Sequence, residues 1–225
     1  MVDKTTPEID GILRKHMIRV PKEIEQASGI RIFGKLIKSL VFTTDIAIIR
    51  NCNANAVIAV YPFTPQPIIS HSIINCSDVP VFCGVGGGTT TGKRVSNLAE
   101  DAEFQGAVGV VLNAPTPNET IMELYEKIDI PIVVTVISGK TDIAKRLESG
   151  VTILNVSGAS DTANIVRKIR EQFPNVPIIA TGGPTPQTIL ETIEAGANAI
   201  TFTPPTNGEL FRNMMNKYRA EENII

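Results

Sequence analysis

Short apolar runs recur along the chain from residue 40 onward, and each is followed by a polar loop and by apolar residues at helical spacing. The runs are rich in Val and Ile and have the length of strands buried on both faces. Eight strands are predicted in this way, at residues 40–45, 56–61, 79–83, 108–113, 131–137, 151–156, 177–181 and 199–203. A strand, a helix and a second strand form a parallel unit with a right-handed crossover. Eight such units predict an α/β protein built as a single (β/α)8 barrel.

The clearest unit spans residues 177–203. Its first strand ends at Gly182 and Gly183, and Thr185 and Pro186 then supply a helix cap and a first-turn proline. Thr-Pro pairs also follow three other predicted strands, at residues 64, 116 and 203. A doubly wound open sheet is the rival fold, but no Gly-x-Gly-x-x-Gly fingerprint follows the first strand. The repeated Thr-Pro pairs after the predicted strands therefore favour the barrel.

The N-terminal part of the chain has a different pattern. Residues 1–38 are predicted to form a helical extension packed on the barrel, with helical pieces at 8–19 and 21–27, and residues 39–225 to form the barrel itself. Such an extension can plug the bottom of a barrel or contact another subunit. The sequence therefore leaves a homo-oligomer open.

Composition and charge narrow the functional classes. The chain has 225 residues, of which 43% are hydrophobic and 20% charged, as in ordinary globular proteins. Its formal net charge of −2 and the lack of a basic tract give no reason to expect nucleic acid as a partner. No apolar run has the length of a membrane span or a secretory core, so no membrane partner is expected. Three irregularly spaced cysteines predict a reducing, cytoplasmic location.

The unit at residues 177–203 resembles the last two strands of phosphate-binding (β/α)8 TIM barrels, the group that includes ribulose-phosphate-binding and flavin-phosphate-binding enzymes. The resemblance is carried by Gly182-Gly183, by Thr185-Pro186-Gln187 and by residues 195–199. It implies that Gly182 and Gly183 hold a phosphate through backbone N–H groups near a helix N-terminus. The next strand departs from that pattern, because Thr201-Phe202-Thr203 stands where the group has Gly-Ser or Gly-Arg. A glycine-poor last strand makes the chain similar to the glycerol uptake operon antiterminator group.

In a barrel, functional side chains are expected at the carboxyl ends of the strands. The candidates there are Thr43, Thr44, Asp45, Tyr61, Cys83, Asn113, Thr135, Ser138, Asn155, Ser157, Thr181 and Thr201. Most are hydroxyls and amides, which orient a ligand but are poor acids or bases near pH 7. We assign Asp45, Asn113, Asn155 and Ser157 to the reacting part of a substrate, and Thr181, Thr201 and Thr203 to ligand binding. Asp45 is either the acid–base group or the cap of the following helix.

The glycine-rich loop at residues 84–94 must be weighed against a nucleotide-binding P-loop. Gly87, Gly92 and Lys93 match the spacing, but Arg94 stands where a Ser or Thr is needed for magnesium. A lid over the barrel mouth fits better, with Lys93 bringing positive charge to an anion. Lys140, after the fifth strand, is a second candidate for the same role. Solvated surface lysines are the alternative for both.

Several chemistries are disfavoured by the residues present. A Schiff-base aldolase of this fold would place a lysine in the sixth strand, where this chain has Asn155. The two histidines lie away from strand ends, so a His-rich metal site lacks its ligands. We therefore expect no metal site and no cofactor, apart from a divalent cation that arrives with the substrate. Cys83 is either a nucleophile or a buried thiol.

Two functions follow from these observations. The first is an enzyme of isomerase or lyase type that acts on a small phosphorylated metabolite at the carboxyl end of the barrel. The second is a non-catalytic, ligand-sensing regulator of the antiterminator-like type, which uses the same pocket without turnover. The fold alone does not separate them.

Overall fold

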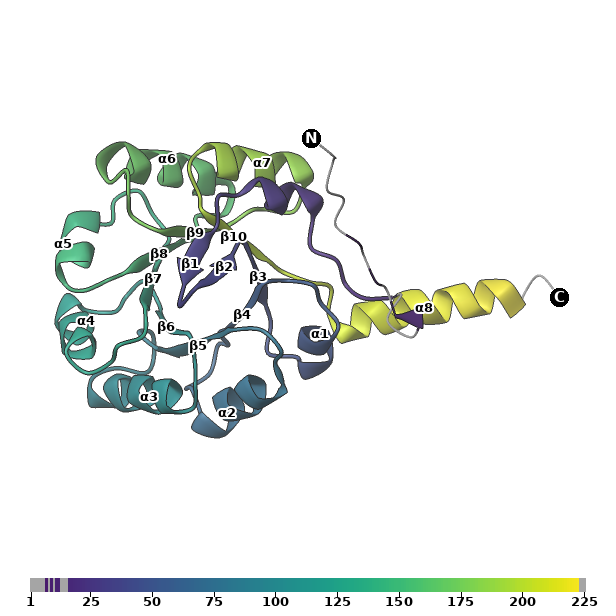
Figure 1. The fold of residues 1–225 in the computed structure, drawn as a ribbon, viewed down its shortest axis with the longest axis horizontal. Helices are drawn as coiled ribbons and strands as arrows, with labels where there is room; N and C mark the ends of the chain where they lie inside the picture. Colours follow the sequence, from purple (N-terminus) through teal and green to yellow (C-terminus); the bar gives the residue numbers. More distant parts are fainter. Residues whose placement is uncertain (1–6, 8, 10, 13–15, 223–225) are drawn as a thin grey trace.

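The computed structural model describes residues 7, 9, 11, 12 and 16–222 and contains a closed barrel of eight parallel strands. Its strands are arranged in the order β10-β3-β4-β5-β6-β7-β8-β9, so that each lies beside its predecessor in the chain and the last closes on the first (Figure 1). The barrel strands are β3 (Ser39–Phe42), β4 (Ala56–Ala59), β5 (Val81–Gly86), β6 (Gly109–Leu112), β7 (Ile132–Val136), β8 (Ile153–Val156), β9 (Ile178–Thr181) and β10 (Ala199–Phe202). The predicted (β/α)8 fold is confirmed.

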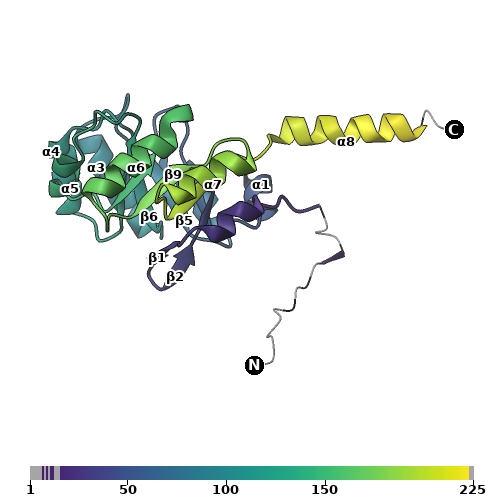
Figure 2. The same cartoon turned by 90° about the horizontal axis from the view of Figure 1, so that it is seen from above.

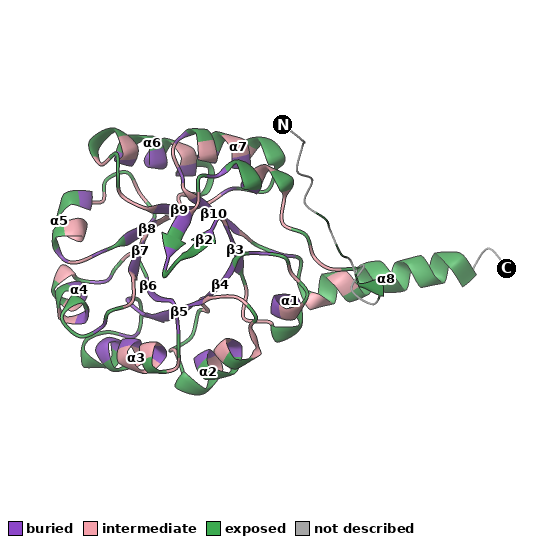
Figure 3. Cartoon of the chain, viewed as in Figure 1, coloured by how far each residue is buried: buried purple, intermediate pink, exposed green. Residues whose placement is uncertain are grey.

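Helices alternate with the strands and surround the barrel in Figure 1. They are α1 (Ile46–Arg50), α2 (Pro67–Cys76), α3 (Lys93–Phe104), α4 (Asn118–Tyr125), α5 (Ile143–Glu148), α6 (Thr162–Gln172), α7 (Pro186–Glu194) and α8 (Asn207–Glu222), with the short 3-10 helix η3 (Ala159–Asp161) before α6. Helices α1 to α7 bury one face against the strands and leave the other exposed (Figure 3). This is why their apolar residues recur at helical spacing.

Alternation along each strand divides the core into two parts. In β3, Leu40 belongs to the cluster inside the barrel, whereas its neighbour Val41 packs outward with the helices. In β5, Phe82 faces inward and Cys83 outward in the same way. Both faces of these strands are therefore buried, which explains the nearly continuous Val and Ile runs in the sequence.

The N-terminal extension closes the amino end of the barrel with a hairpin. Strands β1 (Ile30–Ile32) and β2 (Lys35–Ile37) pair antiparallel, and both lie within the outline of the barrel in Figure 1. Ile30, Ile32 and Ile37 join the apolar cluster inside the barrel. The second predicted helical piece is the 3-10 helix η2 (Lys22–Gln26), which packs on α7. Residues 8, 10 and 13–15 of the first piece lie outside the described residues, and residues 16–19 are not helical, since Ile18 forms a parallel bridge with Cys52.

Of the four Thr-Pro pairs, one forms the predicted cap. The Thr185 hydroxyl accepts from the Thr188 amide at 3.2 Å and the Thr188 hydroxyl accepts from the Thr185 amide at 3.2 Å, with Pro186 in the first turn. Helix α4 begins directly after Pro117, without a side-chain cap from Thr116, and α2 and α8 begin two and three residues beyond their Thr-Pro pairs. The other pairs thus belong to the loops.

Helix α8 differs from the other helices because it projects away from the barrel (Figures 1 and 2). None of its residues is buried. Phe211, Met214, Met215 and Tyr218 are all more than 40% exposed. No helix in the described part of the chain is long and apolar enough to cross a membrane.

Candidate functional site

A cavity of about 280 Å³, called here the mouth cavity, lies at the carboxyl ends of the barrel strands. Its lining residues are Phe42, Ile58, Val60, Val111, Asn113, Thr135, Asn155, Ser157, Thr181, Thr201 and Thr203. Six of the predicted site residues therefore meet here, namely Asn113, Asn155, Ser157, Thr181, Thr201 and Thr203. No Asp, Glu, Lys, Arg or His is among the described residues that line this cavity. Hydroxyls and amides share its lining with four apolar side chains.

Hydrogen bonds between neighbouring strands orient part of this lining. The Asn155 amide nitrogen donates to the Thr135 hydroxyl at 3.4 Å, and the Thr181 hydroxyl donates to the Ser157 hydroxyl at 3.3 Å. Two buried atoms of this lining have no hydrogen-bond partner among the described residues, the amide oxygen of Asn155 and the hydroxyl of Thr201. Thr201 is only 8% exposed. A buried polar atom without a hydrogen bond costs about 1–3 kcal/mol, so both atoms need a partner from the cavity.

Asp45 does not line the mouth cavity and caps a helix instead. One carboxylate oxygen accepts from the amides of Ala47 and Ile48 at 2.8 and 3.2 Å, at the start of α1. The other oxygen accepts from the Asn207 side chain, where α8 begins. Both carboxylate oxygens are therefore occupied in structural bonds. Of the two roles considered for Asp45, the structure shows the cap.

Gly182 and Gly183, the predicted phosphate cradle, also lie outside the lining of the mouth cavity. Gly182 is buried, and a Cβ there would lie 2.7 Å from Ile200 Cγ2 and 2.9 Å from Ile189 Cγ1. The missing side chain thus lets α7 approach β10. Gly183 is exposed with φ +80°, beside the capping box that already uses the amides of Thr185 and Thr188. Packing between α7 and β10 therefore explains why position 182 is a glycine.

The two predicted cations are not brought into the mouth cavity. Lys93 is the first residue of α3, and Lys140 lies in the loop after β7. Both side chains are exposed. The Lys140 amide donates to the Ser138 hydroxyl at 3.2 Å, which fixes the loop rather than the amine.

The loops after β5 and β6 are packed firmly against each other beside the mouth cavity. Gly87 has φ +92°, and a Cβ there would lie 1.8 Å from the Thr116 hydroxyl, so no other residue fits. The Asn113 amide donates to the Gly86 carbonyl at 3.0 Å. Arg146 of α5 holds the same β6 loop by donating to the carbonyls of Ala114 and Thr116 and to the Asn118 side chain. Asn113 is therefore held in a braced loop.

Cys83 faces away from the mouth cavity. It lies in the outer apolar cluster, and burial raises the pKa of its thiol to about 11, with a smaller opposing contribution from a hydrogen bond to Ser70. A thiol with this pKa is almost wholly protonated at neutral pH. The structure supports the buried-thiol interpretation.

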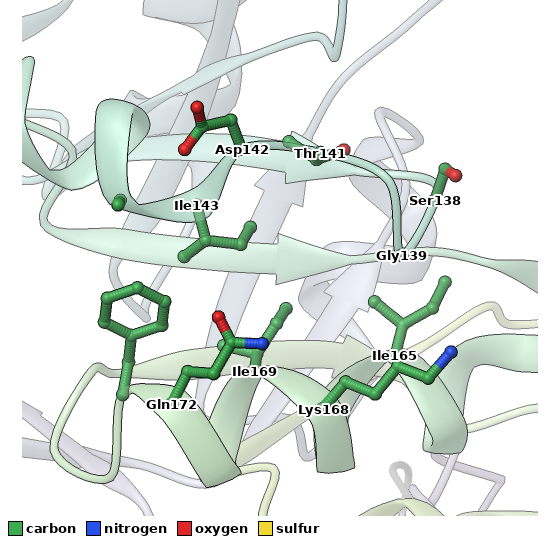
Figure 4. Close-up of a pocket in the computed structure, with 11 residues that line it drawn as sticks. Ser138, Gly139, Thr141, Asp142, Ile143, Ile165, Lys168, Ile169 and Gln172 are labelled. Carbon is green, nitrogen blue, oxygen red and sulfur yellow. The ribbon is translucent and has the colours of Figure 1, made fainter.

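A separate cavity of about 190 Å³, called the outer groove, lies between α5 and α6 (Figure 4). Lys168 and Gln172 extend from α6, and Asp142 lies across the groove (Figure 4). Asp142 is occupied, because it accepts from the Lys145 amide at 3.1 Å and its carboxylate lies 3.5 Å from the Lys145 amine. No buried polar atom without a partner lines this groove among the described residues. The mouth cavity is therefore the stronger candidate.

Four apolar lining residues of the mouth cavity were missed in the sequence, namely Phe42, Ile58, Val60 and Val111. Phe42 and Val60 form an apolar wall, although neither belongs to the predicted polar set. The alternation of Leu40, Val41 and Phe42 carries the signal, since Phe42 shares the inward side of β3 with Leu40. Phe42 was not among the candidates because these were chosen as polar residues at strand ends.

A closed parallel barrel with a polar cavity at the carboxyl ends of its strands defines a (β/α)8 protein, a class whose sites lie at that end. The chain is similar in structure to 2,3-dimethylmalate lyase, a PEP mutase/isocitrate lyase superfamily member, with a TM-score of 0.63, 12% identity, and coverage of 91% of this chain and 86% of that one. For phosphonopyruvate hydrolase in complex with oxalate and Mg2+, the TM-score is 0.62, the identity 9% and the coverage 88% and 84%. For dihydrodipicolinate synthase from Bacillus anthracis, the corresponding values are 0.58, 14%, 82% and 76%.

These identities show a shared fold. The sequence matches no protein-family model and no curated protein. The resemblance to phosphate-binding barrels therefore stays a prediction beyond the (β/α)8 fold itself. Lyases, a hydrolase and a synthase are among the proteins that share it.

The expectation that no cofactor is involved is contradicted by these comparisons. Phosphonopyruvate hydrolase, a structural neighbour, was solved with Mg2+ beside oxalate. In the described residues, however, no three His, Cys, Asp or Glu side chains gather in a way that would hold a metal ion. Mg2+ is usually held through one or two carboxylates, and the hydroxyls and amides of the mouth cavity do not fit that role.

Proposed function

We propose that the protein binds a small phosphorylated metabolite in the mouth cavity. The observation that carries this proposal is the pair of atoms without a protein partner, the Asn155 amide oxygen and the Thr201 hydroxyl. The amide oxygen only accepts a hydrogen bond, whereas the hydroxyl also donates one. A ligand that satisfies both carries a hydroxyl donor and an acceptor oxygen, and phosphate esters of small hydroxylated molecules have both.

The size of the cavity supports a small ligand. At about 280 Å³ it lies just below the usual range for ligand pockets, about 300–1,000 Å³. The hydroxyls of Ser157 and Thr203 add further donors to the lining. Hydroxyls and amides held in fixed positions suit an oxyanion, because they need little reorganisation when it binds.

Two activities are compatible with such a ligand. Lyase or isomerase chemistry is favoured by the names of structural neighbours, which include a lyase and a hydrolase whose complex contains a small diacid. Ligand sensing without turnover is favoured by the neutral lining, since hydroxyls and amides are poor acids or bases near pH 7. We take the enzyme as the first hypothesis and the sensor as the second.

Thermal unfolding with glycerol phosphate, inorganic phosphate and oxalate tests the binding, each with and without MgCl2. A probe at a hundred times its Kd should raise the Tm by about 5–10 °C. The variant Thr201→Val removes the unpartnered hydroxyl with little change in shape and should lose most of that shift. Thr152→Val is the control, because Thr152 bonds Ile132 at the opposite end of the barrel and should keep the shift.

Phosphorus and proton NMR of the bound probe over hours then separates the two activities. Consumption of glycerol phosphate that is lost in Thr201→Val supports the enzyme, and binding without consumption supports the sensor. The proposal is wrong if no probe raises the Tm, or if Thr201→Val and the original protein respond alike.

A further inference from the structure

A second cavity opens beside the mouth cavity at strand β5. It has a volume of about 220 Å³ and shares Val60, Val111 and Asn113 with the mouth cavity. At this place β5 contributes Gly84, which has no side chain and pairs with Val111 in the barrel. A Cβ on Gly84 would come within 3.1 Å of Val60 Cγ2. The glycine thus leaves free the space beside Val60, which lines both cavities. We call the second one the side cavity.

The two walls of the side cavity differ in chemistry. One wall is the loop after β4, with Tyr61, Pro62, Phe63 and Pro65. The other is the end of β5 and the loop after it, where Gly86 and Gly88 present backbone beside Thr89 and Thr90. Flat aromatic and proline surfaces opposite this narrow wall leave a slot that suits a planar group. The mouth cavity combines hydroxyl and amide groups with the apolar side chains of Phe42, Ile58, Val60 and Val111.

The glycine wall is fixed in place. The Gly87 amide donates to the Thr90 carbonyl at 2.9 Å, and Gly87 itself fits tightly against Thr116. The aromatic wall is also tied, because the Tyr61 hydroxyl accepts from the Gln66 amide at 2.8 Å. The slot is thus part of the folded protein and not a gap between loose loops.

A buried polar atom marks the side cavity as a binding surface. Thr90 lines it and is only 5% exposed, yet its hydroxyl has no hydrogen-bond partner among the described residues. Phe63, on the facing wall, is 73% exposed although it is a large apolar side chain. A planar group that fills the slot would cover Phe63, and a polar substituent on that group would supply the hydrogen bond that the Thr90 hydroxyl lacks.

We propose that the two cavities form one cleft and that the ligand of this protein is elongated. Its phosphate and hydroxyl groups bind in the mouth cavity, and an aryl or similar planar arm lies in the side cavity between Phe63 and the glycine wall. This inference rests on the proposed function, because it assigns the head of the ligand to the mouth cavity. It names the substrate class as aryl-substituted phosphorylated compounds.

Calorimetric titration with methyl phosphate and phenyl phosphate tests the proposal, since the two probes share a head and differ in the arm. Burying one aromatic ring should make phenyl phosphate bind roughly 10- to 100-fold more tightly. Phe63→Ala should bring the affinities for the two probes to within about threefold of each other, while the affinity for methyl phosphate stays unchanged. Phe104→Ala is the matched control, because Phe104 is 82% exposed at the end of α3 and does not line the cleft.

A second variant blocks the slot from the other wall. A Cβ on Gly88 would meet only the Asn113 side-chain nitrogen, at 3.5 Å, which is an ordinary contact. Gly88→Leu should therefore fold and exclude phenyl phosphate while it still binds methyl phosphate. The proposal of an elongated ligand is wrong if the original protein binds both probes with equal affinity. It is also wrong if the ratio of the two affinities is the same in Phe63→Ala as in Phe104→Ala. Neither result would contradict binding at the mouth cavity. If neither probe binds, the proposed function itself fails and the inference fails with it.

Discussion

The two ends of the barrel use the same alternating strands for different purposes. At the amino end, the lumen is filled by Phe82 and by isoleucines from the β1–β2 hairpin, and these side chains are nearly inaccessible to solvent. At the carboxyl end, the inward positions carry Asn155, Thr201 and other neutral polar residues around a cavity. A barrel thus concentrates its stability at one end, and the other end is free to carry a site whose polar groups lack protein partners.

Two inward-facing phenylalanines give the largest expected difference between the ends. Phe82 is 0% exposed, so Phe82→Ala should lower the free energy of unfolding by about 3–5 kcal/mol. Phe42 lines the mouth cavity and is 39% exposed, so Phe42→Ala should cost under about 1.5 kcal/mol, because little apolar surface returns to water. Denaturant unfolding of both variants measures the contrast. Equal losses would mean that the mouth is packed as tightly as the floor.

Two arginines brace loops at opposite ends and give the next largest effect. Arg170, at the amino end, donates to the carbonyls of Phe173, Pro174, Val176 and Gly196 and to the Asn198 side chain. Burial lowers the pKa of its guanidinium, which stays charged. Arg170→Met should cost about 2–3 kcal/mol, since several carbonyls lose a charged donor together.

Arg146, at the carboxyl end, braces the loop after β6 with fewer bonds. Arg146→Met should cost about 1–2 kcal/mol of stability. It should also weaken phosphate binding, because Asn113 is held by that loop. The same denaturant curves and the thermal-shift probes measure both effects. A larger stability loss at Arg146 than at Arg170 would reverse the proposed division between the two ends.

The fold could be predicted from the sequence more completely than the site. Strands buried on both faces appear as Val and Ile runs regardless of their partners, so eight strands were predictable. The roles of Asp45 and Gly182 were not predictable. A carboxylate that caps a helix looks the same in the sequence as a catalytic one, and a glycine required for packing looks the same as one that binds a ligand. Contacts remote in sequence decide each case, namely Asn207 for Asp45 and Ile200 for Gly182.

The hairpin was also missed, for a related reason. Its strands are three residues each, and Gly34 with φ +81° makes the turn between them. Runs this short have no distinct period, so the pattern allowed a helical extension as readily as two strands. The side cavity escaped because it depends on the missing side chain at Gly84.

Two threonines give the smallest and most specific test of the comparison. The Thr152 hydroxyl bonds both the amide and the carbonyl of Ile132, at 2.9 and 3.1 Å, so Thr152→Val should lower the free energy of unfolding by about 0.5–1.5 kcal/mol. The Thr201 hydroxyl has no protein partner, and Thr201→Val removes a buried polar atom that nothing satisfies in the ligand-free protein. Its stability should therefore stay within about 0.5 kcal/mol of the original or rise. Denaturant unfolding without ligand compares the two. A loss at Thr201 as large as at Thr152 would show that its hydroxyl serves the fold, which would remove the observation on which ligand binding at the mouth depends.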